Sequence, residues 1–175
     1  QYSRKDSMTM RYHTRHAAVA YANSWWERHT PQFPAFQDDC TNFISQCLYA
    51  GGAPMRGMPN RSQGWWMIGL PERWSYSWSV AHSLRWYLES STKGLMATRV
   101  NSASELELGD VIFYDFTGDG RIDHSTIVTR IEEGIPYVNA HTMNSKNRHY
   151  AYENSSAYTA QMQYYFFHIH DDFPL

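Results

Sequence analysis

The amino-acid sequence predicts an α+β fold in which helices come first along the chain and an antiparallel sheet follows. Helix-type spacing of apolar residues is confined to the part of the chain before Gly94, and strand-like segments separated by glycine turns occupy the part after it. The length of 175 residues suits one domain with its own core. We therefore expect residues 1–11 to form an N-terminal tail and residues 12–175 to form a single domain.

Three helices are expected in the first half of the chain. The first covers residues 12–28, an alanine-rich stretch that ends before a loop with two prolines. The second begins at Asp38 or Asp39, since either side chain can cap a helix N-terminus, and it closes at a glycine pair. Residues 53–78 are rich in Pro, Gly, Met and Trp, which indicates a long irregular segment. Ser79 then opens the third helix.

The second half of the chain predicts a sheet. Its strand-like segments carry β-branched and aromatic residues and are separated by turns that contain glycine. The expected strands are residues 110–116, 124–131, 135–141 and 163–170.

Composition excludes several classes of protein. The formal net charge of −2 gives no reason to expect a nucleic-acid partner. No apolar run approaches the roughly 20 residues that span a bilayer, and the polar first dozen residues show no secretory signal. Cys40 and Cys47 are seven residues apart, which is about 10 Å along a helix. A disulfide needs Cα atoms within roughly 7 Å, so both are expected to be free thiols.

Cys40 is the first candidate for chemistry. It falls in the first turn of the expected second helix, where unpaired backbone N–H groups and the helix dipole favour a thiolate. It also ends an apolar stripe at positions three, four, seven and eight residues further on (Phe43, Ile44, Cys47 and Leu48). From position alone, a small core thiol is as good an interpretation as a nucleophile. Cys47, in the middle of the stripe, is expected to be inert.

His124 is the candidate base. It opens an expected strand after a glycine turn, and a cysteine nucleophile needs such a base together with a residue that orients it. Asn139 and His141 are two apart on the next expected strand, so both can point to the same face.

Several segments together resemble a bacterial family of amidase domains related to the NlpC and CHAP peptidases. The segments are DDCTNFISQCLYAGG, RWSYSWSVAHSLRWYL, ELGDVIFYDFTGDGRIDHSTIV and YVNAHTMNSKNRHY, and they span about residues 12–170. The resemblance implies a papain-like fold in which the nucleophile helix packs on an antiparallel sheet.

The same resemblance implies the site and the substrate. Cys40 takes the place of the nucleophile, His124 that of the base and Asn139 that of the third residue, with His141 in reserve. The Cys40 backbone N–H is the expected oxyanion donor, and Asp39, Trp65, Trp66 and Trp78 are candidates for the substrate cleft. Relatives of this kind usually cut amide bonds in cell-wall peptides, which implies a muropeptide substrate, an extracellular or wall-associated location and no cofactor.

Three other interpretations stay open. The loop DFTGDGRID places Asp115, Asp119 and Asp123 at positions that suit calcium, but it lacks the closing glutamate and joins strands, so a polar turn is favoured. Histidine pairs (His13 with His16, and His168 with His170) allow a zinc hydrolase, although none has a strong zinc spacing. A non-catalytic wall- or carbohydrate-binding module could stack sugars on Trp65, Trp66, Trp74 and Trp78, although these residues suit core packing better.

Overall fold

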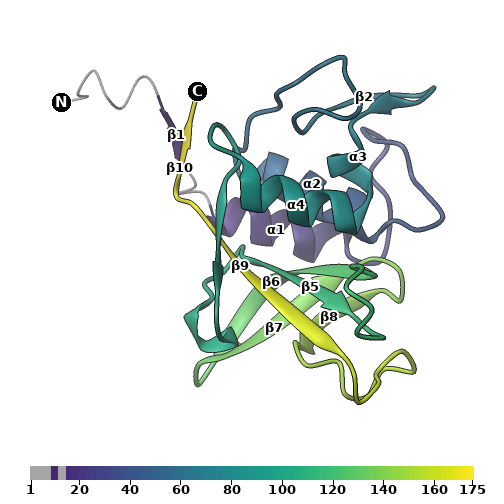
Figure 1. Ribbon diagram of the computed structural model, residues 1–175, viewed down its shortest axis with the longest axis vertical. Coiled ribbons are helices and arrows are strands. Elements are labelled where there is room, and N and C mark those ends of the chain that lie inside the picture. The colour runs from purple at the N-terminus through teal and green to yellow at the C-terminus, as the bar shows by residue number, and fades with distance from the viewer. Residues whose placement is uncertain (1–8, 12–14) are drawn as a thin grey trace.

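The computed structural model describes residues 9–11 and 15–175, with the helices gathered on one face of a sheet (Figure 1). Its helices are α1 (Arg15–Trp25), α2 (Cys40–Ala50), α3 (Tyr76–Ser79), α4 (Ala81–Ser90) and the short 3-10 helix η2 (Ala103–Glu105). Its strands are β1 (Thr9–Arg11), β2 (Met67–Gly69), β3 (Arg73–Trp74), β4 (Ala97–Val100), β5 (Val111–Asp115), β6 (His124–Glu132), β7 (Ile135–Ala140), β8 (Ser145–His149), β9 (Gln163–Ile169) and β10 (Asp172–Pro174).

The main sheet has six strands among the described residues, in the order β4-β9-β5-β6-β7-β8, and every neighbouring pair is antiparallel. Two small ribbons, β1-β10 and β2-β3, complete the pairing. The α+β class and the antiparallel character of the sheet are therefore confirmed. The papain-like topology stays a prediction.

The four expected strands match β5, β6, β7 and β9 to within about two residues at each end. The sequence missed β8, because SKNRH has no apolar alternation, and β4, because ATRV lies at the edge of the sheet with its central residues exposed. The third helix begins at Ala81 instead of Ser79. Thr9–Arg11 pair with Asp172–Pro174, so this part of the expected tail is a strand. Residues 1–8 of that tail and residues 12–14 of the expected first helix lie outside the described residues.

Side chains that alternate along the strands divide the apolar core into two layers. Val111, Phe113 and Ile127 face the helices, where they pack with Phe43, Ile44 and Leu48 of α2. Ile112, Tyr114 and Val128 face the opposite side of the sheet and pack with Tyr152. The two layers matter for the site, because β6 contributes side chains to both.

Helix α2 is buried on all its faces, not only along the expected apolar stripe. Residues 40–48 are all buried, including four polar side chains. Each polar side chain has a partner on a different element: Thr41 with Ser125 of β6, Asn42 with the Trp78 indole, Ser45 with the Trp65 indole and Gln46 with the Tyr21 hydroxyl. Burial without such partners would destabilise the fold, so α2 is fixed from every side.

These bonds also correct the prediction for three tryptophans. Trp65, Trp66 and Trp78 are at most 1% exposed. Their indole N–H groups donate to Ser45, to the Asn60 and Gln63 carbonyls, and to Asn42, respectively. Trp65 and Trp78 therefore join the long segment before α4 to α2, Trp66 ties the segment to itself, and none of the three lines an open cleft.

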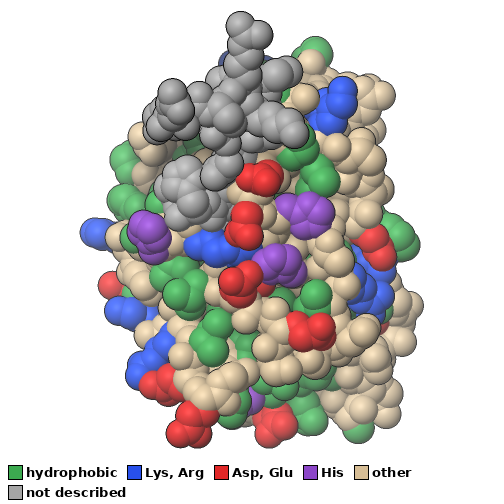
Figure 2. Space-filling model, turned by 90° about the vertical axis from the view of Figure 1, so that its left-hand side faces the viewer, with side chains coloured by type: hydrophobic (Ala, Val, Ile, Leu, Met, Phe, Trp, Pro, Cys, Tyr) green, Lys and Arg blue, Asp and Glu red, His purple; other side chains and the backbone are tan. Residues whose placement is uncertain are grey.

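The face on the left of Figure 1 carries acidic, basic and histidine side chains close together, with hydrophobic side chains scattered between them (Figure 2). Charges of both signs on one face differ from the single-sign surface that binds nucleic acid. Among the described residues, no helix is long and apolar enough to cross a membrane.

Candidate active site

Cys40 is the first residue of α2, and its side chain is only 3% exposed. Its Sγ lies 3.7 Å from Asp38 Oδ1 and 3.7 Å from Thr41 Oγ1. A cavity of about 360 Å³ adjoins the thiol. Its wall comes from the start of α2 (Asp38, Cys40 and Thr41), the junction of α3 and α4 (Ser79, Val80 and Ala81) and the loop before β6 (Arg121, Ile122 and Asp123). A substrate group in this cavity would meet the sulfur directly.

A helix N-terminus is expected to lower the pKa of a thiol, but the pKa of Cys40 is raised. Burial raises the pKa of the Cys40 thiol, and the Asp38 carboxylate raises it further. Hydrogen bonds from Thr41 and Ser125 act in the opposite direction without reversing the shift. Cys40 is therefore a thiol at neutral pH, and it needs a base to become a nucleophile. Both cysteines are free, as predicted, and Cys47 is completely buried.

His124 opens β6 and is 5% exposed. It pairs with Tyr114 across the strands, and its ring packs against the rings of Tyr114, Phe116 and Tyr152. Burial lowers the pKa of His124 from 6.5 to about 4, and the charge of Arg148 contributes to the shift. His124 is therefore neutral at pH 7, in the form that can accept a proton.

The structure brings Cys40 and His124 to neighbouring positions without a direct bond. Ser125, the residue after His124, lies with its hydroxyl 3.1 Å from Thr41 Oγ1 and acts to lower the pKa of the Cys40 thiol, which places the thiol near the start of β6. Within the described part of the chain, no hydrogen bond joins Cys40 Sγ to the His124 ring. The Nε2 atom of His124 lies 3.2 Å from the Tyr152 hydroxyl instead.

Tyr152 is a site residue that the sequence did not reveal. It is 2% exposed and has a positive φ of 58°, which is uncommon for an aromatic residue. The Arg148 guanidinium lies 4.0 Å over its ring. Burial raises the pKa of the Tyr152 hydroxyl. Hydrogen bonding from Ser145 and the charge of Arg148 lower this pKa, and the charge of Cys40 raises it further. Tyr152 is thus in contact with His124 and within electrostatic range of Cys40.

Asn139 lies away from this group. Its Oδ1 accepts hydrogen bonds from Thr129 Oγ1 and from the Asn147 backbone N–H, both at 2.8 Å, and its Nδ2 donates to Asn23 Oδ1 at 2.9 Å. The amide is completely buried and its polar atoms are occupied. The structure therefore places Asn139 among groups that join α1, β6, β7 and β8, and it does not bring the amide to His124.

His141 belongs to a second group, with Asp39. His141 Nδ1 lies 2.6 Å from Asp39 Oδ2, and His141 Nε2 lies 2.5 Å from the Trp25 carbonyl oxygen. Both ring nitrogens of His141 are therefore occupied by partners on other elements, the start of α2 and the end of α1. Burial alone would raise the pKa of the Asp39 carboxyl, but bonds from His141, Asn42 and the Phe36 N–H hold it below its usual value.

Two groups of residues have the composition of a metal site. His29, Asp39 and His141 place one ligand atom each within 4.8 Å of one another, as do Asp115, Asp119 and Asp123. In the first group, both nitrogens of His141 already bond to Asp39 and Trp25. In the second, Asp115 accepts three backbone N–H groups, from Gly118, Asp119 and Gly120. This bonding closes a polar turn, the interpretation that the sequence favoured.

The histidine pairs that suggested zinc have other partners. His168 Nδ1 lies 3.0 Å from buried Asp110, and His170 Nε2 lies 2.7 Å from Thr98 Oγ1. His13, the partner expected for His16, lies outside the described residues.

The fold and the site together define an α+β domain in which a cavity-lining cysteine begins a buried helix and a neutral histidine begins the adjacent strand. Residues 12–167 match the family model described as "Putative amidase domain". The chain belongs to this family of amidase domains.

Two relatives from Bacillus subtilis (strain 168) match the chain. It is 57% identical to "Uncharacterized protein YhbB" over 156 residues, which is 89% of the chain and 50% of that protein. It is 30% identical to "Uncharacterized protein YjcM" over 140 residues, which is 75% of the chain and 31% of that protein. The chain thus spans half or less of the length of these relatives. No solved structure matches the chain.

The buried neutral state of His124 predicts how stability depends on pH. Because its pKa is about 4 in the folded protein and 6.5 in the unfolded chain, the unfolded chain takes up a proton in that window and the folded protein does not. Lowering the pH from about 7 to about 5 should therefore reduce the unfolding free energy by about 2 kcal/mol through this residue. His124→Gln should lose less stability over the same interval, as measured by urea unfolding at both pH values. Equal losses in both proteins would show that His124 is not the cause.

The Asp38 carboxylate predicts how fast Cys40 reacts. Because its negative charge raises the pKa of the thiol, Asp38→Asn should lower that pKa and speed alkylation of Cys40 by iodoacetamide several-fold at neutral pH. Peptide mapping by mass spectrometry would follow Cys40 and Cys47 separately. Glu133→Gln, in the exposed turn at the far end of β6, is the matched control and should leave the rate unchanged. An unchanged rate in Asp38→Asn would contradict the assigned cause.

Proposed function

We propose that this domain is a cysteine-nucleophile hydrolase that cleaves amide bonds, with peptides of the bacterial cell wall as its substrates. The observation that carries the proposal is the position of Cys40, a thiol at the wall of a cavity and at the N-terminus of a buried helix, next to a neutral buried histidine. Membership of an amidase domain family supports the reaction class. The cell-wall substrate and an extracellular or wall-associated location rest on the resemblance to NlpC and CHAP peptidases.

The reaction proceeds in two steps of acyl transfer. His124 takes the proton from the Cys40 thiol as the sulfur attacks the amide carbonyl carbon, and the imidazolium then gives that proton to the departing amine. Water, activated by the neutral His124, attacks the thioester and releases the acid and the thiol. A neutral thiol and a neutral histidine fit a base-assisted attack better than a thiolate–imidazolium pair formed in advance.

The start of α2 supports the oxyanion. Asp39 occupies the N-cap position but makes no capping bond with its side chain, which bonds to His141, Asn42 and the Phe36 N–H instead. Within the described chain, no hydrogen bond is made by the Cys40 backbone N–H. This N–H group, at the positive end of the helix dipole, is the donor we assign to the developing oxyanion.

We assign the third position of the triad to Tyr152 in place of Asn139 or His141. Its hydroxyl is the hydrogen-bonding partner of His124 Nε2, whereas Asn139 and His141 are bonded elsewhere. In the tautomer that the base requires, Nε2–H donates to the Tyr152 oxygen and the Nδ1 lone pair is left to accept the thiol proton. His124 Nδ1 makes no hydrogen bond with any described residue, which leaves it available for this role.

The nucleophile assignment predicts that Cys40→Ala abolishes hydrolysis of defined muropeptides, by at least about three orders of magnitude, while the fold is retained. Cys47→Ala is the matched control, because Cys47 lies on the same helix but is enclosed by the core. It should cost stability and keep activity at temperatures where the protein is folded. Product masses would identify the bond that is cut. Hydrolysis that survives in Cys40→Ala would overturn the assignment.

The Tyr152 assignment predicts that Tyr152→Phe lowers kcat about tenfold or more with little change in KM, because the ring stays while the bond that orients His124 is lost. Asn139→Ala should instead reduce the unfolding free energy by about 1–3 kcal/mol, since it leaves buried partners unpaired, and should leave kcat near that of the wild type. Kinetics and urea unfolding on both variants provide the comparison. A larger loss of kcat in Asn139→Ala would return the third position to Asn139.

A further inference from the structure

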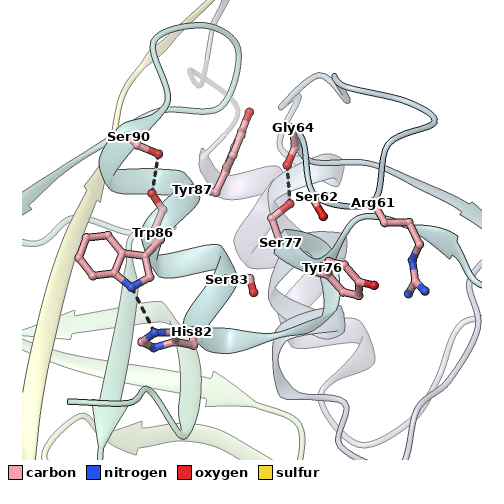
Figure 3. A pocket seen from close by; sticks show the side chains of 10 residues that line it. All are labelled: Arg61, Ser62, Gly64, Tyr76, Ser77, His82, Ser83, Trp86, Tyr87 and Ser90. Atoms are coloured by element: carbon pink, nitrogen blue, oxygen red, sulfur yellow. Dashed lines mark hydrogen bonds between the residues drawn. The ribbon is translucent and has the colours of Figure 1, made fainter.

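A second cavity, of about 490 Å³, lies between α4 and the segment that includes α3 (Figure 3). We call it the Trp86 pocket; its wall includes Trp86, Tyr87 and Ser83 of α4, Tyr76 of α3, and Arg61 and Ser62 of the preceding loop. Its volume falls in the range of about 300–1,000 Å³ that is typical of small-molecule sites. The cell-wall amidase proposed above makes no use of this pocket in its reaction.

The pocket has two exposed aromatic side chains that are nonetheless held in place. Trp86 is 50% exposed, yet the Arg85 guanidinium lies 3.8 Å from its ring centroid and its indole nitrogen lies 3.2 Å from His82 Nε2. Tyr76 is 44% exposed, with the Arg61 guanidinium 4.6 Å over its ring. Exposed rings that are already ordered lose little conformational entropy when a ligand packs on them.

The polar groups of the wall narrow the ligand chemistry. Four serines line the pocket, and the hydroxyls of Ser62 and Ser83 make no hydrogen bond with any described residue. No acidic side chain lines it, and its permanent charge is the Arg61 guanidinium. Hydroxyls can donate and accept, and aromatic faces pack against C–H groups, so a saccharide matches both kinds of surface. The basic charge suits a sugar that is neutral or carries a carboxylate.

A peptide fits this wall less well. An extended peptide gains affinity mainly by pairing its backbone with a free strand edge. The pocket is built from helices and a turn, and no strand of the described chain lines it.

The Trp86 pocket and the Cys40 cavity share one wall. Ser79, Val80 and Ala81 line the Cys40 cavity, and Ser77 and His82, which lie within two residues of them along the chain, line the Trp86 pocket. His82 Nδ1 also lies 3.2 Å from the backbone nitrogen of Ile122, which lines the Cys40 cavity. A molecule that joins a sugar to a peptide could therefore occupy both cavities by passing over the exposed Val80.

The geometry points to the Trp86 pocket as a saccharide subsite, which binds the sugar part of a glycan-linked peptide while Cys40 acts on its amide bond. This inference rests on the proposed amidase function for the role of the subsite. Binding of a sugar by the pocket does not depend on catalysis and can be tested separately.

The binding test uses Cys40→Ala protein and N,N′,N″-triacetylchitotriose, an uncharged oligosaccharide called chitotriose below, with binding followed by tryptophan fluorescence and by NMR titration. We expect saturable binding that Trp86→Ala weakens about tenfold or more, as loss of a stacking platform should. Tyr158→Ala removes an exposed aromatic side chain outside the pocket and should leave the affinity unchanged. Absence of saturable binding, or equal affinity in Trp86→Ala, would overturn the inference.

The kinetic test compares one amide bond in two substrates, with and without the attached glycan. Trp86→Ala should raise KM for the glycan-linked substrate and leave the free peptide unaffected. Equal effects on both substrates would overturn the subsite. If the wild type binds chitotriose but hydrolyses neither substrate, the proposed amidase function fails and the saccharide site stands.

Discussion

The paired Asp39 and His141 form the interaction on which the site depends. This pair joins the end of α1, the start of α2 and the end of β7: His141 reaches Asp39 at 2.6 Å and the Trp25 carbonyl at 2.5 Å, and its ring stacks on Phe43 with 4.0 Å between centroids. Loss of one partner of this buried pair leaves polar atoms of the other without a hydrogen bond. The value of the pair here is geometric, because Asp39 directly precedes Cys40 and fixes where the helix begins.

The same principle explains the rest of α2. A helix buried on every side must find partners for all its polar side chains, and Asn42 and Ser45 find them in the indoles of Trp78 and Trp65. The long segment between α2 and α4 is therefore tied to the core, since it supplies hydrogen-bond donors to α2. Because that segment ends in α3 and the junction that lines the Cys40 cavity, the bonds that bury α2 also shape the space beside its first residue.

The elements that could be predicted from the sequence are those whose signal is local. Helix α2 shows a cap position, an apolar stripe and closing glycines, and β5, β6 and β9 show dense β-branched and aromatic residues. The hydrogen-bond partners of Trp65 and Trp78 lie 20 and 36 residues away along the chain. Composition does not encode such partners, so the sequence left these residues as cleft candidates although core packing suited them better. Tyr152 follows an irregular turn with no periodic pattern, and only the folded chain brings it to His124.

Asn139 shows a different limit of prediction from sequence. The alternation of a strand gives the face on which a side chain lies, but it does not give the neighbour to which that side chain bonds.

The charge states of Cys40 and His124 constrain how the proposed reaction can begin. Burial disfavours both the Cys40 thiolate and the His124 imidazolium, so proton transfer between them in the empty site would create two buried charges. The transfer becomes favourable only when the negative charge passes on to the substrate oxygen, where the N–H groups at the start of α2 can receive it. The exposed Asp38 carboxylate, 3.7 Å from the sulfur, adds a further condition, because its charge opposes the thiolate until a substrate group approaches it. In the proposed mechanism, this arrangement links activation of the thiol to occupation of the cavity.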